Sequence, residues 1–394
     1  MRISATAQSG QGMTMSAPLA GITVLEMGSS LAGPYGARLL ADFGARVIKV
    51  EAPGSGDTAR SWGKEKLAGT SATYQALNFG KRSIVVDFKD ETEVDVLKKF
   101  IAAEADVVLQ NLRPGIAEKL GLGPEDVTQL NSRIVYCNIS AFGRSGPYAQ
   151  MPGYDPLIQA FSGIVDLTGP ADGSPARVGV PIIDLGTGLW SALGVMAALH
   201  TRARTGEGSI VDAAMSDTAM AYQTVSQATI ESGGPMPKRS GLTGPLLVPN
   251  TGYQTSDGLL IITVGTDRQF GKLCDVIDRS ALAADERFTT NTHRLEHEGA
   301  LRQELEVVLR TNTRAHWSKL LNAANVPNAP IQSAPEVLAH EQTKASGVVK
   351  SSPDGSFGLV ANALKLDGHR PGFENFAPEL GEATEDILAK YRGT

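Results

Sequence analysis

The chain has 394 residues, more than one domain usually holds, and this favours two folded units. Its net charge of -6, from 36 Lys and Arg against 42 Asp and Glu, argues against a general nucleic-acid surface. Two cysteines, Cys137 and Cys274, are too few for a disulfide framework or a cysteine zinc site. They fit a reducing compartment, so we expect a cytoplasmic protein. No apolar stretch approaches the roughly 20 residues of a spanning helix, so no membrane partner is expected.

The first half of the chain alternates strand and helix patterns. The expected elements are strands at 22–27, 45–51, 83–87, 105–110 and 134–140 and helices at 33–44 and 91–104. A strand, a helix and a strand with short joints form the βαβ unit of a parallel sheet. The expected fold class is therefore α/β, with a large Rossmann-like open parallel-sheet domain.

The second half contains a smaller unit. An apolar helix at 189–201, a short strand before residue 213 and a long helical pattern at 213–231 lead to a Gly- and Pro-dense segment at 232–250. Residues 251–330 indicate a compact α+β unit. The expected division is a disordered extension at 1–16, a large α/β domain at 17–225 and 335–394, and a linker with the small domain at 226–334.

Asp184 stands between an apolar run, Val180 to Ile183, and the glycines Gly186 and Gly188. The run suits a buried extended segment, and burying a lone carboxylate costs several kcal/mol, so roughly speaking Asp184 needs a partner or a chemical task. Local sequence leaves two interpretations open. Asp184 either caps the helix at 189–201 or takes part in catalysis.

Basic residues follow or precede several strands. Arg60 in Gly54-Ser-Gly-Asp-Thr-Ala-Arg indicates either a phosphate cradle or a simple turn, without a complete dinucleotide or P-loop motif. Lys81, Arg82 and Arg113 lie beside strands and suit either a polyanionic small molecule or solvated loops. Arg113 follows a strand at the edge where open α/β sheets bind ligands. The six histidines show no metal-ligand pattern, so no metal is expected.

Several longer motifs occur in order along the chain. They are Leu19-Ala-Gly-Ile-Thr-Val-Leu-Glu, Gly44-Ala-Arg-Val-Ile-Lys-Val-Glu-Ala-Pro-Gly-Ser-Gly-Asp, Asn111-Leu-Arg-Pro-Gly, Gly143-Arg-Ser-Gly-Pro-Tyr, Gly153-Tyr-Asp-Pro and Val180-Pro-Ile-Ile-Asp-Leu-Gly-Thr-Gly. From about residue 19 to 366 the chain resembles the class III CoA-transferases, a family that includes formyl-CoA transferase, carnitine CoA-transferase and α-methylacyl-CoA racemase. These transferases of sulfur-containing groups use acyl-CoA as a substrate and no metal.

The resemblance implies that Asp184 is the nucleophile. It would attack the thioester of an acyl-CoA to give an aspartyl anhydride, then an aspartyl-CoA thioester, which an acceptor carboxylate would attack. A cap role would then be compatible with catalysis, because a helix N-terminus keeps a carboxylate ionised. Backbone N–H groups near Gly186 or in a glycine loop would stabilise oxyanions.

The resemblance also implies the CoA contacts. Leu31 and Ala32 match the adenine end, Lys81 and Arg113 the phosphates, and Arg144 a Phe-Gly-x-x-Gly-Pro turn. Two features depart from the formyl-CoA enzymes, which have Gln at the position of Leu31 and Arg at the position of Ala52. Their run of four glycines is reduced here to Gly241-Leu-Thr-Gly244.

Tyr154 stands where the racemases of this family have histidine. Tyrosine, with a pKa of about 10, is a poor base at neutral pH, so CoA transfer is favoured over racemisation. A racemase and a non-catalytic CoA-binding protein stay as alternatives. The segment 169–180 resembles the branch that acts on short dicarboxylates, with succinyl-CoA as a possible donor. There Arg177 either binds a distal carboxylate or is structural.

The family forms interlocked, ring-like homodimers. The resemblance therefore implies a homodimer in which residues 226–250 and 325–350 are the crossing linkers. The implied partners are an acyl-CoA and a small carboxylic acid.

Overall fold

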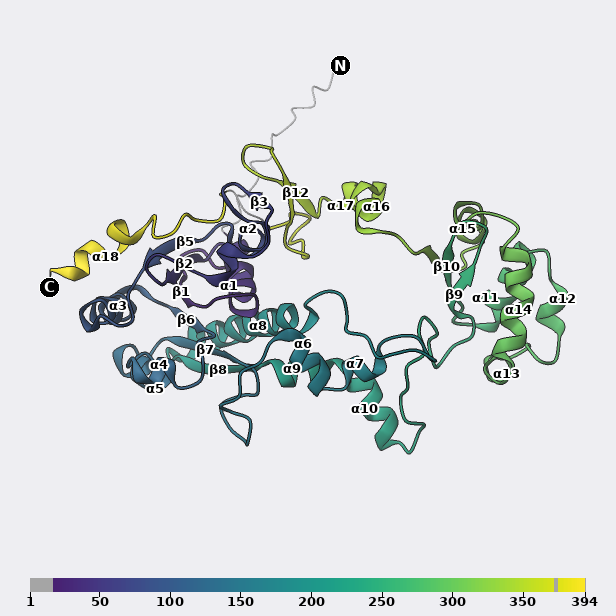
Figure 1. The fold of residues 1–394 in the computed structure, drawn as a ribbon, viewed down its shortest axis with the longest axis horizontal. Helices are drawn as coiled ribbons and strands as arrows, with labels where there is room; N and C mark the ends of the chain where they lie inside the picture. The colour runs from purple at the N-terminus through teal and green to yellow at the C-terminus, as the bar shows by residue number, and fades with distance from the viewer. Residues whose placement is uncertain (1–16, 372–374, 394) are drawn as a thin grey trace, which may run out of the picture. The chain divides into compact units, whose positions relative to one another are not determined.

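The computed structural model describes residues 17–371 and 375–393, so the extension expected at 1–16 lies outside the described residues. The chain forms two compact units (Figure 1). The first contains the described residues up to 162 together with 180–222 and 347–393, and the second contains 163–179 and 223–346. The sequence analysis expected these breaks at 225 and 334, and the chain divides at 222 and 346. The segment 163–179 joins the second unit because its backbone contacts residues 239–241 there.

The first unit contains a six-stranded sheet in which every strand pair is parallel. Its strands are β1 (Thr23–Met27), β2 (Arg46–Glu51), β5 (Arg82–Val85), β6 (Val107–Gln110), β7 (Val135–Ser140) and β8 (Ser209–Ala214), in the order β5-β2-β1-β6-β7-β8. The expected open parallel sheet is confirmed. The chain winds outward in both directions from the middle, so β1 and β6 flank the topological switch point, where such sheets bind ligands.

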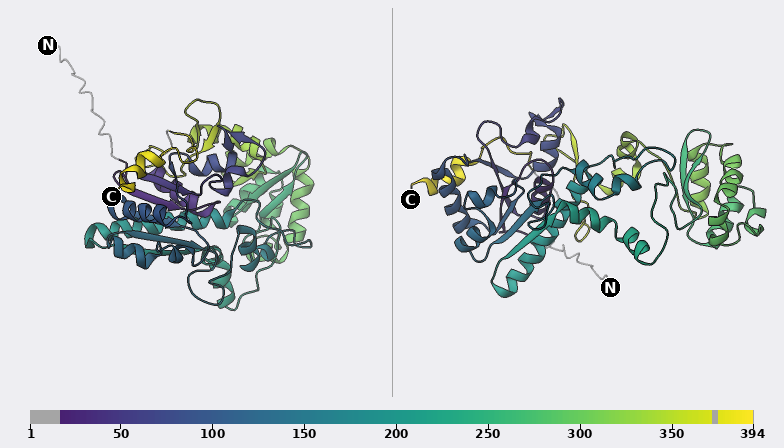
Figure 2. Two further views of the ribbon diagram at one scale, coloured as in Figure 1. Left: turned by 60° about the vertical axis from the view of Figure 1, so that its left-hand side comes forward. Right: turned by 60° about the horizontal axis from the view of Figure 1, so that its bottom comes forward.

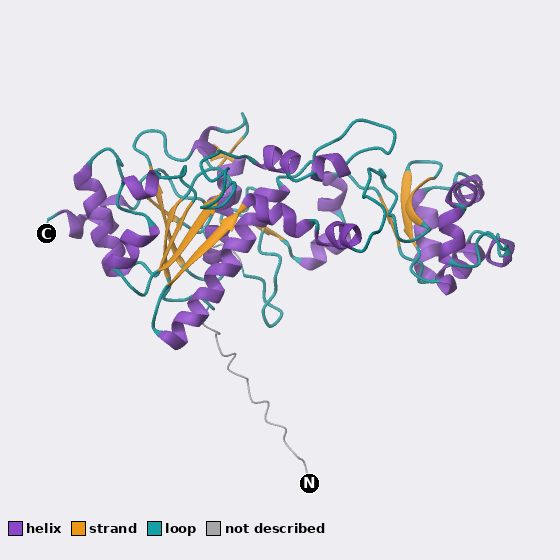
Figure 3. Cartoon of the chain, turned by 90° about the horizontal axis from the view of Figure 1, so that it is seen from below, coloured by secondary structure: helices purple, strands orange, loops and turns teal. Residues whose placement is uncertain are grey.

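Helices cover both faces of this sheet, drawn in orange between purple helices in Figure 3. Neighbouring residues of one strand point to opposite faces, so Leu25 belongs to one apolar core and Val24 to the other. The first core is completed by α3 (Glu91–Glu104), α5 (Pro124–Leu130) and α18 (Thr384–Arg392). The second is completed by α1 (Ala32–Asp42) and α8 (Ile182–Thr205).

Helix α8 starts seven residues before the predicted 189, so the extended segment expected at 180–183 is wrong. It has 24 residues and is long and apolar enough to cross a membrane, which corrects the expectation that no stretch approaches that length. Half of the apolar stretch of α8 is buried, because α8 packs on α1 and on the sheet. Glycines permit close packing there: a Cβ on Gly188 would lie 2.7 Å from the Ala32 carbonyl oxygen, and one on Gly36 2.9 Å from the Gly188 carbonyl oxygen.

The long helix predicted at 213–231 is two helices. Strand β8 extends to Ala214, α9 covers Met215–Tyr222, and α10 covers Thr224–Glu231 after a break at Gln223. The remaining described elements of the first unit are η1 (Thr58–Ser61), β3 (Lys66–Leu67), β4 (Thr70–Ser71), α2 (Ala72–Asn78), α4 (Ile116–Lys119), α6 (Asp155–Phe161), β12 (Val349–Ser351) and β13 (Gly358–Val360).

The second unit, seen from two further sides in Figure 2, has its own core. Its antiparallel sheet, in the order β11-β10-β9, consists of β9 (Asn250–Gln254), β10 (Leu259–Thr263) and β11 (Asn328–Pro330). The helices are α7 (Ile164–Leu167), α10, α11 (Asp267–Val276), α12 (Ala281–Ala284), α13 (Asn291–Glu296), α14 (Glu298–Leu309), α15 (Arg314–Ala323), α16 (Ala334–Ala339) and α17 (Glu341–Ser346). Leu260, Phe270, Leu305 and Trp317 pack together in the core.

Candidate active site

Asp184 is the third residue of α8 and is 8% exposed. Asp184 interacts electrostatically with Asp155, which is the first residue of α6 and is 3% exposed. The Asp155 Oδ2 accepts hydrogen bonds from the backbone N–H of Ile183 at 2.7 Å and of Asp184 at 3.2 Å. Two acidic residues from different helices therefore share the first turn of α8.

Asp184 is not the cap of its helix. The first four N–H groups of a helix lack intrahelical acceptors, and here Asp155 accepts from the second and third. Ile182 N, which is the first because Pro181 has no N–H, donates to the Val180 carbonyl at 2.8 Å, and Leu185 N forms the first intrahelical bond, to the Pro181 carbonyl at 3.0 Å. The capping interpretation of Asp184 is wrong because Asp155 supplies the acceptor.

Burial raises the pKa of Asp184 to about 7, and the negative charge of Asp155 adds to the shift. A carboxylate with this pKa is substantially ionised at neutral pH. It is also poorly hydrated, which makes its oxygens more reactive as nucleophiles. Asp184 is therefore suited to attack at physiological pH.

Gly186 contributes packing space at this site. As the fifth residue of α8 it lies within the regular helix, so its N–H does not serve the oxyanion role expected from the sequence. A Cβ at this position would lie 1.8 Å from the Tyr222 hydroxyl oxygen. Gly186 thus allows Tyr222, at the end of α9, to lie against α8, and burial raises the pKa of this tyrosine.

The switch point carries two of the predicted CoA contacts. Leu31, half-buried, and Ala32, buried, form the start of α1 directly after β1. Asn111, which follows β6, bridges the two loops: its Oδ1 accepts from Ser29 N and its Nδ2 donates to Ser29 O, both at 2.9 Å. The predicted adenine contacts therefore lie at the ligand edge of the sheet.

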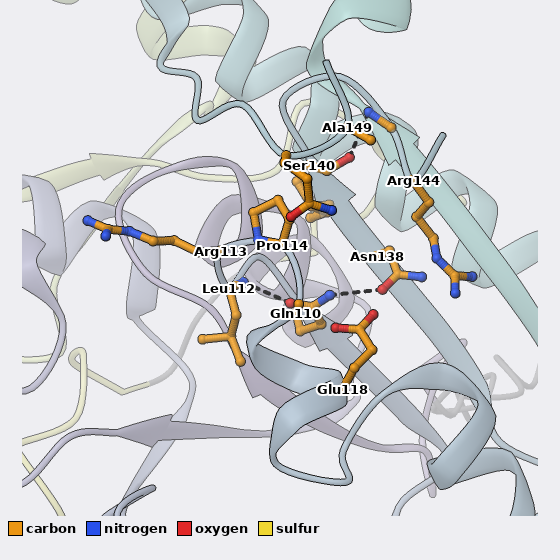
Figure 4. A pocket seen from close by; sticks show the side chains of 13 residues that line it. Gln110, Leu112, Arg113, Pro114, Glu118, Asn138, Ser140, Arg144 and Ala149 are labelled. Atoms are coloured by element: carbon orange, nitrogen blue, oxygen red, sulfur yellow. Dashed lines mark hydrogen bonds between the residues drawn. The ribbon is translucent and has the colours of Figure 1, made fainter. Parts of the chain in front are cut away.

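Arg113 and Arg144 line one pocket at the carboxyl ends of β6 and β7 (Figure 4). Both side chains are exposed. Arg144 forms an ion pair with Glu125 at 2.9 Å, while the Arg113 side chain extends to the other side of the pocket in Figure 4. Arg113 thus lies at the edge predicted from the sequence, and Arg144, expected only as part of a Phe-Gly-x-x-Gly-Pro turn, lines the same pocket.

A chain of side-chain hydrogen bonds runs across three strand ends at this pocket, and Figure 4 shows its first two bonds, those of Gln110. Leu112 N donates to Gln110 Oε1 at 2.7 Å, Gln110 Nε2 donates to Asn138 Oδ1 at 2.8 Å, and Asn138 Nδ2 donates to Asp212 Oδ1 at 2.8 Å. The carboxylate of Asp212 accepts only, so it fixes the direction of both amides. This relay fixes the turn that carries Arg113.

Lys81 has a different place from the one expected. Its side chain is fully buried, and its Nζ donates to Glu26 Oε2 at 2.7 Å, Pro34 O at 2.8 Å and Asn78 Oδ1 at 2.9 Å. Neither a solvated loop nor a phosphate contact fits an ammonium with three buried acceptors. Lys81 instead links the first turn of α1 to β1 and α2.

Two other basic residues also have protein partners. Arg82 pairs with Asp386 at 2.8 Å, and Arg60 pairs with Glu51 at 2.6 Å. The glycine turn before Arg60 ends at Asp57, whose Oδ1 accepts from Ala59 N. The turn interpretation of this motif therefore fits better than the phosphate cradle.

The substrate and loop residues fall in both units. Tyr154 precedes Asp155 in the first unit and is 62% exposed. Arg177, Gly241 and Gly244 belong to the second unit, where Arg177 is exposed. Within it, Gly241 N donates to Gly169 O at 3.0 Å and Gly244 N to Asn250 O at 2.8 Å. Among residues 17–371 and 375–393, no cluster of three or more His, Cys, Asp or Glu side chains suits a metal ion.

Tyr222, Gln110 and Asn138 were not singled out from the sequence, and Asp155 appeared only within the motif Gly153-Tyr-Asp-Pro, with no role of its own. A signal existed only for Asp155, because an acidic residue followed by Pro is typical of a helix start. Asp155 accepts hydrogen bonds from residues 28 and 29 positions further along the chain, and no local sequence pattern indicates contacts of that separation.

Known proteins share this architecture. The family model described as CoA-transferase family III matches residues 19–384. The chain belongs to CoA-transferase family III. A succinate–glutarate CoA-transferase of Agrobacterium fabrum is 38% identical and covers 95% of each chain. An acetyl-CoA:oxalate CoA-transferase of Acetobacter aceti is 36% identical and covers 93% of each.

Solved structures agree. A CAIB/BAIF family protein from Brucella suis superposes with a TM-score of 0.86 at 36% identity, over 95% of this chain and 100% of that one. The predicted family is confirmed, and with it the predicted enzyme class. The protein is a CoA-transferase that moves CoA to a carboxylic acid.

Proposed function

We propose that Asp184 is the nucleophile of this CoA transfer. The observation that carries the proposal is a buried carboxylate in the first turn of α8, with a pKa raised to about 7 by burial and by Asp155. Structural carboxylates are usually paired with a cation or fully hydrogen-bonded, whereas this one is placed beside a like charge.

The reaction proceeds in four attacks. An Asp184 oxygen attacks the thioester carbonyl of the donor, and CoA leaves as a thiolate from the resulting anhydride. The thiolate attacks the aspartyl carbonyl and expels the donor acid. The acceptor carboxylate attacks this aspartyl-CoA thioester and releases the thiolate again. The thiolate then attacks the acceptor's acyl carbon, which forms the new acyl-CoA and restores the Asp184 carboxylate.

CoA is proposed to bind at the switch-point edge of the sheet. Leu31 and Ala32 offer an apolar turn for the adenine end, and Arg113 and Arg144 supply positive charge for the phosphates. Lys81 supports this edge from beneath, because its Nζ donates to the Pro34 carbonyl in the first turn of α1.

For the substrates, we propose succinyl-CoA as donor and a short dicarboxylate as acceptor. The support is the name of the Agrobacterium fabrum relative, a succinate–glutarate CoA-transferase. Arg177, exposed in the second unit, is the proposed partner of a distal carboxylate, and Gly241 and Gly244 are the proposed counterparts of the family's glycine loop.

We further propose a cytoplasmic, interlocked homodimer. Large apolar side chains along α8 support an assembly, because Leu189, Trp190 and Leu193 are 55%, 46% and 49% exposed. These residues alternate on the helix with the buried positions that face α1. The proposed crossing linkers, 226–250 and 325–350, lie near the two ends of the segment 223–346 of the second unit.

Intact-mass analysis after incubation with succinyl-CoA tests the nucleophile, with hydroxylamine added to trap the acylated enzyme. The wild-type chain should gain mass, and Asp184→Asn should gain none. An adduct that persists in Asp184→Asn would contradict the assignment. Exchange of the α-proton of a 2-methylacyl-CoA with solvent deuterium, without any acceptor acid, would favour a racemase instead.

A further inference from the structure

We propose that Asp155 is the positioning residue of the nucleophile, and that its carboxylate holds the first turn of α8 in the conformation from which Asp184 attacks the thioester. This inference rests on the proposed role of Asp184. It assigns a task to a residue that takes no part in the covalent steps.

The first argument is the geometry of the helix start. The N-cap residue of α8 is Pro181, whose side chain has no acceptor. Asp155 Oδ2 accepts from Ile183 N at 2.7 Å and Asp184 N at 3.2 Å, so α6 supplies the acceptor that α8 lacks. One of these two N–H groups belongs to the nucleophile itself.

The second argument is that Asp155 is itself held in place. Gln159, one turn further along α6 and fully buried, donates from Nε2 to Asp155 Oδ1 at 2.6 Å. Asp155 is 3% exposed, so its three hydrogen bonds form away from bulk water, where charge-assisted bonds are strong. The hydrogen bonds that Gln159 and the backbone of Asp184 donate to Asp155 therefore form a rigid connection between α6 and α8.

The third argument is the charge of the capping group. Serine or asparagine caps a helix as well as aspartate does, and either would avoid a like charge beside Asp184. Two buried carboxylates that share one helix turn repel each other when both are ionised. The aspartate is thus unfavourable for folding but favourable for a nucleophile, because it fixes the backbone and its charge makes the ionised Asp184 more basic and so more reactive.

Single-turnover formation of the acyl adduct from saturating succinyl-CoA, together with CoA affinity measured by calorimetry, tests the proposal. Asp155→Ala removes the acceptor, and Asp155→Asn keeps an acceptor but removes the charge. The matched control is Asp90→Ala, which removes the cap of α3, where Asp90 accepts from Thr92 N at 2.9 Å. Melting curves of all variants give the folded fraction.

Asp155→Ala should form the adduct about 10- to 100-fold more slowly with unchanged CoA affinity, because a small misplacement of a reacting group costs this much. Asp155→Asn should slow adduct formation less than Asp155→Ala does. Its rate should rise with pH over a lower pH range than in the wild type, because the charge of Asp155 no longer raises the pKa of Asp184. Asp90→Ala should form the adduct at the wild-type rate below its melting temperature.

An Asp155→Ala protein that forms the adduct at the wild-type rate would overturn the proposal, as would a rate loss no larger than the loss of folded protein. If Asp155→Ala does not fold, Asp155→Asn and Gln159→Met decide by the same criterion: an unchanged adduct rate in both overturns the proposal. A wild-type chain that forms no adduct with any acyl-CoA would overturn the proposed function as well, so the two failures are distinguishable.

Discussion

The Asp184 N–H donates to the carboxylate of Asp155 across 3.2 Å, while burial and this same carboxylate raise the pKa of the Asp184 side chain to about 7. One acidic residue therefore orders the backbone of the other and opposes its ionisation. Tyr222, from α9, lies against the same helix at Gly186. These contacts, together with the pocket lined by Arg113 and Arg144, lead to four predictions.

The rate of adduct formation should rise with pH through about 7. Only the ionised Asp184 attacks, and the carboxylate with a raised pKa is mostly protonated below 7 and mostly ionised above it. Single-turnover rates between about pH 5.5 and 8.5 at constant ionic strength measure this dependence. A rate independent of pH across this interval would contradict the assignment of the nucleophile.

Asp184→Asn should stabilise the fold at neutral and alkaline pH. The folded pKa exceeds the unfolded value of about 3.9, so the folded chain binds more protons between the two values and loses stability as pH rises. Above about pH 7 the full loss of unfolding free energy is present. It amounts to at most about 4 kcal/mol, at about 1.4 kcal/mol per pKa unit. Asparagine does not ionise, so Asp184→Asn avoids this loss of stability.

Thermal melts of both proteins at about pH 4 and pH 8 measure the difference. The melting temperature of Asp184→Asn should exceed that of the wild type only at the higher pH. Asp95→Asn makes the same charge change on the exposed face of α3 and should give no such pH-dependent gain. An equal gain at both pH values would contradict the prediction.

Gly186→Ala should destabilise the first unit by about 1–3 kcal/mol, because the new methyl group would overlap the Tyr222 hydroxyl. The double variant with Tyr222→Phe should recover part of this loss. Denaturant unfolding measures both. The matched control is Gly299→Ala in α14, where nothing lies within 4 Å of the new Cβ and helix propensity favours alanine. Equal losses at both glycines would contradict the steric explanation.

Asn138→Ala should weaken CoA binding and leave the adduct rate at saturating acyl-CoA unchanged. It removes the hydrogen bonds that Asn138 makes with Gln110 and Asp212. The buried Gln110 Nε2 is left without its acceptor, which costs about 1–3 kcal/mol of stability. The turn that carries Arg113 then loses its orientation. Calorimetric titration with CoA gives the affinity, and Asn328→Ala in the second unit serves as a control. Loss of the adduct rate with unchanged affinity would disprove the role of the relay.

The strands of the first unit were predictable because they are buried runs of β-branched residues bounded by turns, and α3 was predicted with its observed bounds. The start of α8 was not, since Ile182 and Ile183 favour strands locally, whereas proline at position 181 is equally typical of a helix start. Tertiary contacts with α1 and Asp155 decide between the two.

The site was predicted in part. Asp184, Arg113 and Arg144 lie where the motifs indicated ligand or nucleophile positions, although their chemical roles stay predictions. Lys81 was misplaced because its neighbours in sequence are a glycine and an arginine, while its buried partner Glu26 is 55 residues away. Contacts of this separation are decided by the fold and leave no local pattern.

The contact between Gly36 and Gly188 ties together the starts of two helices. Helix α1 begins at the proposed adenine contacts, α8 begins near the proposed nucleophile, and the two glycines bring their backbones close together. In the proposed binding mode the pantetheine arm of CoA has to span from the start of α1 to Asp184. A larger residue at Gly36 or Gly188 would push the two helices apart and change that span.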